Sequence, residues 1–404
     1  MNVIMGPPTS LSLLIMGLLS AFPATAQGEL DASVLLDLLP DAPKERQSEA
    51  FQKVGSSGSP SYVLPLLDLL RHATTPDEWF RALDALTPLI GEDARALEGP
   101  WWTLSERRIA ERAEERASAP PGYRAFKTAL LARGVDPAYD RLLAPHLPTR
   151  IPFEEIQWGG VEIDGIPALE DPKTLPADEA DFLLDDARVF GIVVGGEARA
   201  YPGQILDWHE MANDLLGGEP IALTWCTLCG APIAYRAVRG EEPTRLRFGS
   251  SGLLYRSNKL MFDRASETLW NQLTGEPVLG SRVALGDLDP LVKLPVRTTT
   301  WGAWRLEYPE TTVVSPSTGY ERDYAPGAAY GDYFASPRTM FPVPGGDGTF
   351  APKESLIVTY GPTRSWATRT EDLREARVLR FGAGDAAVTL VAQEAATKAR
   401  SADP

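Results

Sequence analysis

The hydrophobic pattern of this chain changes its period once, and that change limits the folds that are open to it. From Leu30 to about His146, apolar residues recur at helical spacing. Beyond a junction rich in proline and glycine, between Pro145 and Pro172, short runs of β-branched and aromatic residues take over. Residues three and four apart share one face of a helix, whereas strand residues alternate between two faces. We therefore predict an α+β protein with helices first and a β-rich core after them.

Two stretches carry the helical signal most clearly. In "SYVLPLLDLLRHA" the apolar residues fall at positions i, i+3, i+4 and i+7. The stretch "TPDEWFRALDALTPLIG" begins with Thr75 as a candidate cap, has Glu78 three residues later, and carries an apolar stripe of Trp79, Leu83 and Leu86. With "ERQSEAFQKVGSSGSP" ahead of them, these helices resemble a degenerate repeat of the HEAT type. Residues 28–148 are predicted to form this α-helical, HEAT-like region.

The remaining chain is predicted to divide into a β-rich core domain, residues 150–335, and a degenerate C-terminal structural repeat with a tail, residues 336–404. "IVVGGEARAY" from Ile192 lies over "IVTYGPTRSW" from Ile357 without a gap, which suggests an internal duplication. In the same register Arg374 stands in the place of His209, and Val391 in the place of Cys226. The second copy therefore lacks the candidate chemistry of the first.

Charge narrows the range of partners. The chain has 39 Lys plus Arg against 55 Asp plus Glu, a formal net charge of -16, and no run rich in Lys or Arg. Nucleic acids and anionic membrane surfaces attract concentrated positive charge. We therefore expect no nucleic-acid partner, and an unidentified small molecule or protein as the partner instead.

The N-terminal sequence is typical of a secretory signal peptide. An apolar stretch from Leu11 to Phe22 is followed by Ala24-Thr25-Ala26, although no Lys or Arg precedes it. Twelve apolar residues are short of the ~20 that span a bilayer. Residues 1–26 are therefore predicted to be a signal peptide, with no membrane span in the mature chain. The protein is expected to be exported, periplasmic or extracellular, and so to meet an oxidising compartment.

The only two cysteines lie in "TWCTLCGAP", as Cys226 and Cys229. They stand between two predicted strands, "IALTW" and "IAYRAV", in a turn that resembles the knuckle of a zinc ribbon. A thioredoxin motif would instead begin a helix, and Gly230 and Pro232 argue against one. The cysteines are therefore predicted to lie in a β-turn.

A histidine is predicted to lie near this turn. In "YPGQILDWHEMANDLLGG" one helical stripe holds Ile205, Trp208, Ala212 and Leu215, and Gly217-Gly218 would end the helix. His209 falls on the same apolar face and so should point inward. The neighbouring acids Asp207 and Glu210 are expected on the solvent face, with a second-shell role as the alternative.

The first functional hypothesis joins these residues in a metal site. Convergence of His209, Cys226 and Cys229 would leave a fourth position for a soft ligand such as Met261. Soft donors favour a copper ion, with zinc as the alternative, and so a copper-dependent oxidoreductase. Further candidates for catalysis are Asp263, Arg264 and Gln272.

Several spaced motifs are similar to one known family. "GVEIDGIPAL", "EARAYPGQIL", "LCG", "MFDR", "TTWGAW" and "STGYERDY" together resemble the family catalogued as domain of unknown function 3179, from about Ile156 to Tyr333. Where that family commonly has Tyr-Cys-Pro-Leu-Cys-Gly, this chain has Trp225 and Thr227. The resemblance implies no settled reaction.

Two other hypotheses therefore stay open beside the metal site. One is a non-catalytic protein in which the helices bind a partner and Cys226 and Cys229 form a structural disulfide. The other is a thiol-disulfide oxidoreductase that uses the same two cysteines, because Cys-x-x-Cys spacing serves all three purposes.

Overall fold

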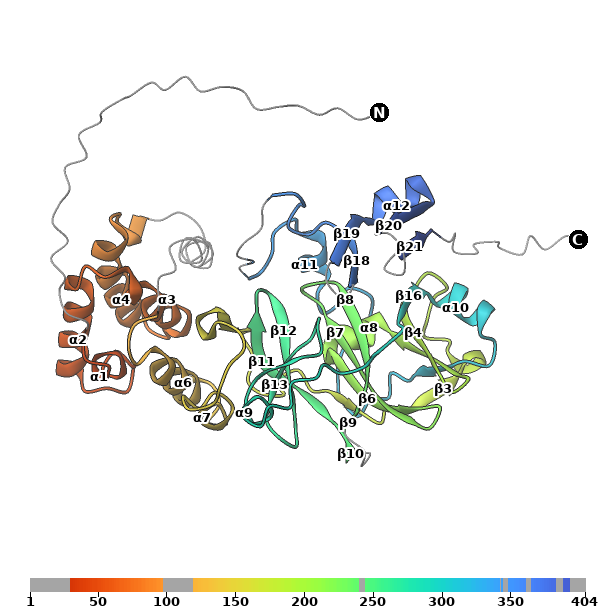
Figure 1. The fold of residues 1–404 in the computed structure, drawn as a ribbon, viewed down its shortest axis with the longest axis horizontal. Helices are drawn as coiled ribbons and strands as arrows, with labels where there is room; N and C mark the ends of the chain where they lie inside the picture. The colour runs from red at the N-terminus through yellow and green to blue at the C-terminus, as the bar shows by residue number, and fades with distance from the viewer. Residues whose placement is uncertain are drawn as a thin grey trace, which may run out of the picture.

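The computed structural model describes residues 30–96, 119–239, 244–341, 343, 348–360, 365–382 and 388–392. The predicted signal peptide, residues 1–26, lies outside these ranges. Helices come first along the chain and several β-sheets follow, which confirms the predicted α+β class (Figure 1). None of the helices in the described ranges has both the length and the apolar composition that crossing a membrane requires.

The helical region is built from short helices that bury one apolar face. In α4 the Thr75 hydroxyl accepts a hydrogen bond from the backbone amide of Glu78 at 3.3 Å, as the cap prediction required. Leu83 and Leu86 of the predicted stripe are buried, whereas Trp79 is exposed. The HEAT-like repeat stays a prediction. The helices are α1 Ser33–Leu36, α2 Lys44–Ser56, α3 Val63–His72, α4 Pro76–Ile90, α6 Tyr123–Gly134 and α7 Tyr139–Leu142.

Among the described residues, the β-rich region contains three five-stranded sheets, which we number 1 to 3. Sheet 1 is antiparallel throughout, in the order β1-β11-β12-β13-β14. Sheet 2 has the order β15-β8-β7-β6-β2, and sheet 3 the order β16-β4-β5-β17-β3. Sheets 2 and 3 each contain one parallel pair, β2 with β6 and β17 with β5.

The strands of these sheets are short. Sheet 1 comprises β1 Ile156–Trp158, β11 Phe248–Tyr255, β12 Asn258–Asp263, β13 Leu269–Asn271 and β14 Pro277–Leu279. Sheet 2 comprises β2 Leu169–Glu170, β6 Met211–Leu216, β7 Glu219–Cys226, β8 Ala231–Arg236 and β15 Lys293–Leu294. Sheet 3 comprises β3 Thr174–Pro176, β4 Arg188–Val194, β5 Glu197–Pro202, β16 Arg297–Thr300 and β17 Thr312–Val314.

Smaller elements complete the fold. Three two-stranded sheets pair β9 Val238–Arg239 with β10 Thr244–Arg245, β18 Leu356–Tyr360 with β19 Ser365–Arg369, and β20 Val378–Phe381 with β21 Val388–Val391. The helices of this half are α8 Gly203–His209, α9 Ser281–Ala284, α10 Trp301–Glu307, α11 Gly331–Ala335 and α12 Thr370–Ala376.

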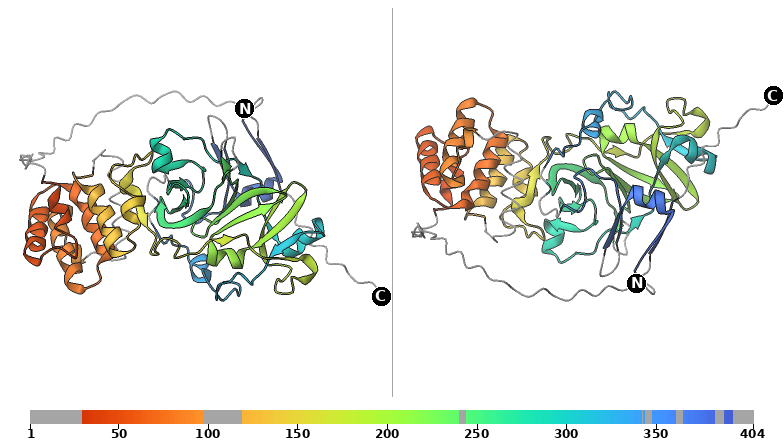
Figure 2. Two further views of the ribbon diagram at one scale, coloured as in Figure 1. Left: turned by 90° about the horizontal axis from the view of Figure 1, so that it is seen from below. Right: turned by 90° about the horizontal axis from the view of Figure 1, so that it is seen from above.

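The helices and sheet 1 share one hydrophobic core. Leu66, Leu86 and Phe126 of the helices belong to the same buried cluster as Leu260 and Leu269 of sheet 1. The helical region therefore lies directly against the β-rich region, as two further views show (Figure 2). The predicted domain boundary near residue 149 falls within this packed contact.

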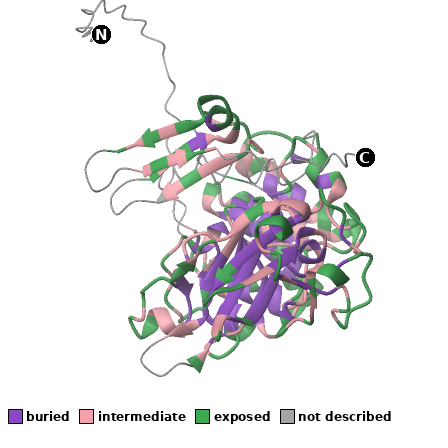
Figure 3. Cartoon of the chain, turned by 90° about the vertical axis from the view of Figure 1, so that its right-hand side faces the viewer, coloured by how far each residue is buried: buried purple, intermediate pink, exposed green. Residues whose placement is uncertain are grey.

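Sheet 2 lies between the other two sheets in the packing. Leu223 and Trp225 of β7 join a buried cluster with Phe190 of sheet 3, while Ala222 joins another with Phe248 of sheet 1. Most strand residues in this part of the molecule are buried (Figure 3). Strand β7, which ends at Cys226, is therefore held on both of its faces.

The helix predicted around His209 is shorter than expected. It ends at His209, and Glu210 adopts a left-handed conformation with φ 53°. Residues Met211–Leu216 form strand β6, and Gly217-Gly218 is the turn of a hairpin with β7. The predicted stripe through Ala212 and Leu215 was wrong, because these residues alternate across a strand.

The predicted duplication stays a prediction. The order of two strands, a helix and two strands occurs in β4-β5-α8-β6-β7 and again in β18-β19-α12-β20-β21. Among the described residues, however, the second set forms isolated two-stranded sheets, whereas the first joins five-stranded ones.

Candidate functional site

The two cysteines lie in the turn between the central strands of sheet 2. Cys226 is the last residue of β7 and pairs with Ala231 of β8, and Gly230 closes the turn with φ 61°. The amide of Cys229 donates to the carbonyl oxygen of Cys226 at 3.2 Å. Strands stand on both sides of the turn, as predicted, and no helix begins at it.

Both cysteines are free thiols, and they differ in exposure. The two sulfur atoms are 2.8 Å apart. Cys226 is 2% exposed, whereas Cys229 is an exposed residue. The side-chain amide of Asn258 donates to the Cys229 sulfur at 3.2 Å. Cys226 is therefore a buried residue, and Cys229 is an exposed residue whose sulfur contacts Cys226 and Asn258.

The hydrogen bonds around the pair make the two thiols unequal acids. Burial alone raises the pKa of the Cys226 thiol. Hydrogen bonds from the Cys229 side chain and from the backbone amides of Lys259 and Cys229 outweigh burial and bring that pKa below its ordinary value. The hydrogen bond with Cys226 raises the pKa of Cys229, and so do the burial of its thiol and the charge on the Cys226 sulfur. Of the two thiols, Cys226 is therefore the one that loses its proton at the lower pH.

A buried ion pair lies beside Cys226. Lys259 Nζ is 2.7 Å from Glu210 Oε2, and both side chains are at least nine-tenths buried. Glu210 Oε1 also accepts hydrogen bonds from the Thr227 hydroxyl at 3.1 Å and the Tyr330 hydroxyl at 3.3 Å. The left-handed backbone at Glu210 ends α8 and directs this carboxylate into the protein. Sequence reasoning had expected Glu210 on the solvent face, and this expectation was wrong.

These groups line a small cavity with a volume of about 60 Å³. Its polar lining includes Cys226, Glu210, Lys259 and Tyr330. Its apolar lining includes Val161, Ile166, Leu228, Leu253, Met340 and Phe341. Cys229 is not among the lining residues. Of the two cysteines, Cys226 is therefore the one that lines the cavity.

The predicted metal ligands do not converge. His209 is buried, but Nδ1 is 2.8 Å from the carbonyl oxygen of Pro167 and Nε2 is 2.6 Å from the Tyr324 hydroxyl. A carbonyl can only accept, so Nδ1 carries the proton and the Nε2 lone pair is taken by Tyr324. Within the described part of the chain, no three His, Cys, Asp or Glu side chains are grouped so as to hold a metal ion.

Met261 also lies outside the cavity. It is fully buried in a cluster with Phe248 and Trp270, and it opposes Trp270 across β12 and β13. The donor set proposed for copper or zinc, a histidine and a methionine beside two thiolates, is therefore not assembled by the described residues.

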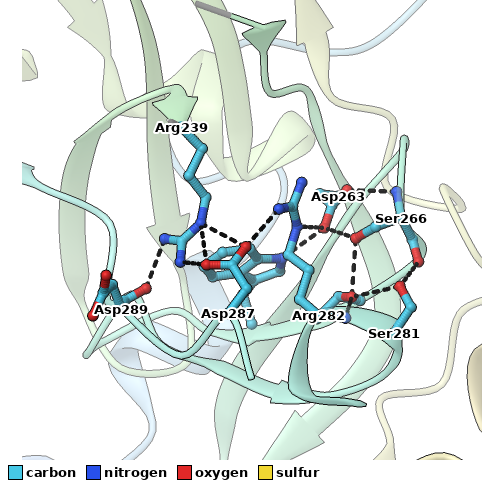
Figure 4. A network of polar contacts seen from close by, with 9 residues as sticks. Arg239, Asp263, Ser266, Ser281, Arg282, Asp287 and Asp289 are labelled. Carbon is cyan, nitrogen blue, oxygen red and sulfur yellow. Dashed lines mark hydrogen bonds and ion pairs between the residues drawn. The ribbon is translucent and has the colours of Figure 1, made fainter. Parts of the chain in front are cut away.

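Two of the predicted catalytic residues, Asp263 and Arg264, stabilise loops through hydrogen bonds and ion pairs. Buried Asp263 accepts hydrogen bonds from the Ser266 amide at 2.7 Å and from Trp270 Nε1 at 2.9 Å, and it pairs with Arg282 at 3.3 Å (Figure 4). Arg264 forms an ion pair with Asp164 at 2.6 Å. Neither residue lines the cavity at Cys226.

Gln272 does reach the cysteine pair, through another side chain. Its Oε1 accepts a hydrogen bond from Asn258 at 2.8 Å, and its Nε2 donates to the Thr224 hydroxyl at 3.0 Å. Asn258 in turn donates to the Cys229 sulfur. Gln272 is therefore a positioning residue that fixes Asn258 against the turn.

Comparison with known proteins places this site in a family. The model of a family described as a protein of unknown function, DUF3179, matches residues 163–404. The chain belongs to this family. The match begins after the helical region and runs on through residues 336–404, beyond the end of the motifs recognised in the sequence. Neither the comparison with curated proteins nor the one with solved structures found a match.

Sequence reasoning missed three residues of the site in this DUF3179 chain. Lys259 stands in "NKLMFD", and a lysine within a run that is otherwise suited to a buried strand signals a buried partner charge. Thr227 lies between the cysteines and had been noted only as a departure from the family pattern. Tyr330 comes from a loop about a hundred residues later in the chain. Only the fold brings it to the cavity.

Removal of one thiol should shift the pKa of the other. In Cys229→Ala we expect the pKa of Cys226 to rise, because the side-chain hydrogen bond that most favours its thiolate is lost while burial remains. In Cys226→Ala the pKa of Cys229 should fall, since that hydrogen bond and the nearby charge are gone. The thiolate absorbance and the alkylation rate, measured against pH, report both shifts. Identical titration of Cys226 with and without Cys229 would contradict this account.

Proposed function

We propose that the protein is a thiol-disulfide oxidoreductase in which Cys226 and Cys229 alternate between a dithiol and a disulfide. The observation that carries this proposal is the pair of free sulfurs 2.8 Å apart, one buried and one exposed. A disulfide has a sulfur-sulfur distance of about 2.05 Å. Closure of the bond therefore needs only a small movement of the turn.

The difference between the two thiols suits exchange with a partner. In the oxidised protein an incoming thiolate attacks the exposed Cys229 sulfur and forms a mixed disulfide with it. The bond between the two cysteines breaks, and Cys226 leaves as a thiolate. A thiol of lower pKa leaves faster. Buried Cys226 then stands ready to attack the mixed disulfide and release the partner.

A structural disulfide is the main competing explanation. It would close a very short loop, and short loops restrict the unfolded chain less than long ones. The network that holds Cys229, through Asn258 and Gln272, is already complete with both thiols reduced. The turn therefore has its native contacts without the covalent bond.

The redox potential tests the proposal. After equilibration of the purified protein in glutathione or dithiothreitol buffers, trapped thiols should give a midpoint between about −300 and −120 mV, the range of exchange-active pairs. A midpoint below about −300 mV would indicate a structural disulfide. The failure of any disulfide to form would overturn the proposal. Copper or zinc bound at one ion per chain, and lost in Cys226→Ser, would favour the metal hypothesis instead.

Single variants supply a matched control. With glutathione disulfide, Cys226→Ser should form a mixed disulfide at exposed Cys229. Cys229→Ser should react far more slowly, because its remaining sulfur is buried. Equal reaction of the two variants, measured by intact mass, would contradict the assignment of Cys229 as the accessible thiol.

A further inference from the structure

The two cysteines of the pair have different surroundings. Cys226 lines the cavity of about 60 Å³, and Cys229 is an exposed residue. A cavity needs roughly 10–15 Å³ of such volume for one water molecule. This cavity therefore has room for a molecule of a few heavy atoms.

The cavity offers hydrogen-bond donors to such a molecule. An ammonium group has three N–H donors, and Lys259 Nζ has Glu210 Oε2 beside it at 2.7 Å. No hydrogen-bond acceptor in good geometry meets Nζ within the described residues. Because the Lys259 side chain is 5% exposed, water at the surface cannot readily satisfy its other N–H groups. Tyr330 and Thr227 also line the cavity, but their hydroxyls donate to Glu210 Oε1, so Lys259 supplies the donor.

A cysteine thiol, the nearby Lys259 ammonium and a space for few atoms together suit one class of oxidant. We propose that this cavity binds a small hydroperoxide, hydrogen peroxide in the simplest case, and that Cys226 reduces it. This inference rests on the proposed function, since Cys229 must then form the disulfide. It identifies the hydroperoxide as the electron acceptor. The electron donor, an external dithiol, would then react at exposed Cys229.

The chemistry balances in two steps. The Cys226 thiolate attacks the terminal oxygen of the hydroperoxide, a sulfur-oxygen bond forms, and the oxygen-oxygen bond breaks. The leaving oxygen takes the electron pair and a proton, and departs as water or an alcohol, while Cys226 becomes a sulfenic acid. The Cys229 sulfur then attacks Cys226, and the hydroxyl leaves with the Cys229 proton as water. An external dithiol that attacks exposed Cys229 returns both cysteines to thiols.

Lys259 would stabilise the charge that develops on the leaving oxygen. A preorganised donor of this kind contributes about 100-fold or more in rate when water is excluded. Tyr330 donates to Glu210 Oε1 at 3.3 Å and so positions the carboxylate that lies beside Lys259, and Met340 and Phe341 cover the same cavity from the following segment. The ring of Phe341 lies 4.9 Å from the Arg71 guanidinium of helix α3, so the helical region supports this wall.

The test measures hydrogen peroxide consumption by the reduced full-length protein in rapid mixing. We expect one peroxide consumed per disulfide formed, at least about 100-fold faster than by Cys226→Ser or by free glutathione. Cys229→Ser should stop at the sulfenic acid on Cys226, which dimedone traps for mass spectrometry. Because the cavity is small, tert-butyl hydroperoxide should react more slowly than hydrogen peroxide.

Lining variants keep the proposal falsifiable. Lys259→Met, if it folds, should lose about 100-fold in rate. Tyr330→Phe keeps the ring and removes only the hydrogen bond to Glu210, so it should lose far less. Lys53→Met replaces an exposed lysine of α2 and should leave the rate unchanged. Wild-type protein that forms a reversible disulfide in glutathione buffers, but consumes peroxide no faster than glutathione does, would overturn this inference and leave the proposed function standing. Failure to form any disulfide would remove both.

Discussion

Replacement of Lys259 by methionine is expected to lower the free energy of unfolding by about 3–5 kcal/mol. The substitution leaves the Glu210 carboxylate buried without its cation, and removal of one partner of a buried ion pair costs about this much stability. Lys259 and Glu210 face each other at 2.7 Å with side-chain exposures of 5% and 10%. Without the ammonium, the Glu210 carboxylate keeps the hydrogen bonds from Thr227 and Tyr330 and loses its only ion-pair partner among the described residues.

The double variant Glu210→Gln with Lys259→Met is the matched control. It removes both charges, and neutral replacement of a buried pair is far less costly than removal of one partner. We therefore expect it to recover most of the lost stability. Urea unfolding followed by tryptophan fluorescence measures all three proteins. A loss below about 1 kcal/mol in Lys259→Met would show that water reaches the pair and that the cavity is open.

Gly217→Ala should destabilise the protein by about 3 kcal/mol or more. Gly217 begins the turn between β6 and β7 with φ 56°, a conformation that costs an L residue roughly 1–2 kcal/mol. An added Cβ would also lie 2.1 Å from the carbonyl oxygen of Val194, the last residue of β4 before the neighbouring hairpin turn. Overpacking adds about 1–3 kcal/mol, and here the opposing atom belongs to the backbone and cannot rotate away.

The adjacent glycine separates the two contributions. Gly218 has φ 78°, and a Cβ added there would have no atom within 4 Å. Gly218→Ala therefore carries only the cost of the left-handed backbone, and it should lose about 1–2 kcal/mol. The difference between the unfolding midpoints of the two variants, in heat or in urea, measures the steric cost that arises because the two turns lie so close together. Equal losses in both variants would mean that the turns move apart without cost.

The sequence was sufficient to predict the elements that have a clear period. The apolar spacing in α3, the cap at Thr75 and the β-rich runs after residue 172 all formed the expected structures. Residues 211–216 did not, because a short apolar run fits a helix and a strand equally well. The Gly-Gly pair at 217 and 218, with positive φ at both positions, is the signal of a two-residue hairpin that would have decided between them.

The candidate site was predictable only in its local part. The cysteine turn follows from the two strands that enclose it, and those strands are visible in the sequence. The direction of the His209 ring depends on Tyr324, and the partner of Glu210 depends on Lys259. Such contacts join residues that are far apart in the sequence, so the local spacing of apolar residues cannot predict them. The inward position of His209 was therefore correct, and its expected convergence with the cysteines was not reproduced.

The core that the helices share with sheet 1 has a consequence for any attempt to isolate the family-matched half. Leu253, Leu260 and Leu269 bury themselves partly against α-helical residues. A fragment that starts at residue 150 would present these leucines to water, and exposed apolar patches of this kind promote aggregation. The helices therefore act as an integral cover for the sheet, and both halves are expected to melt together in one cooperative transition.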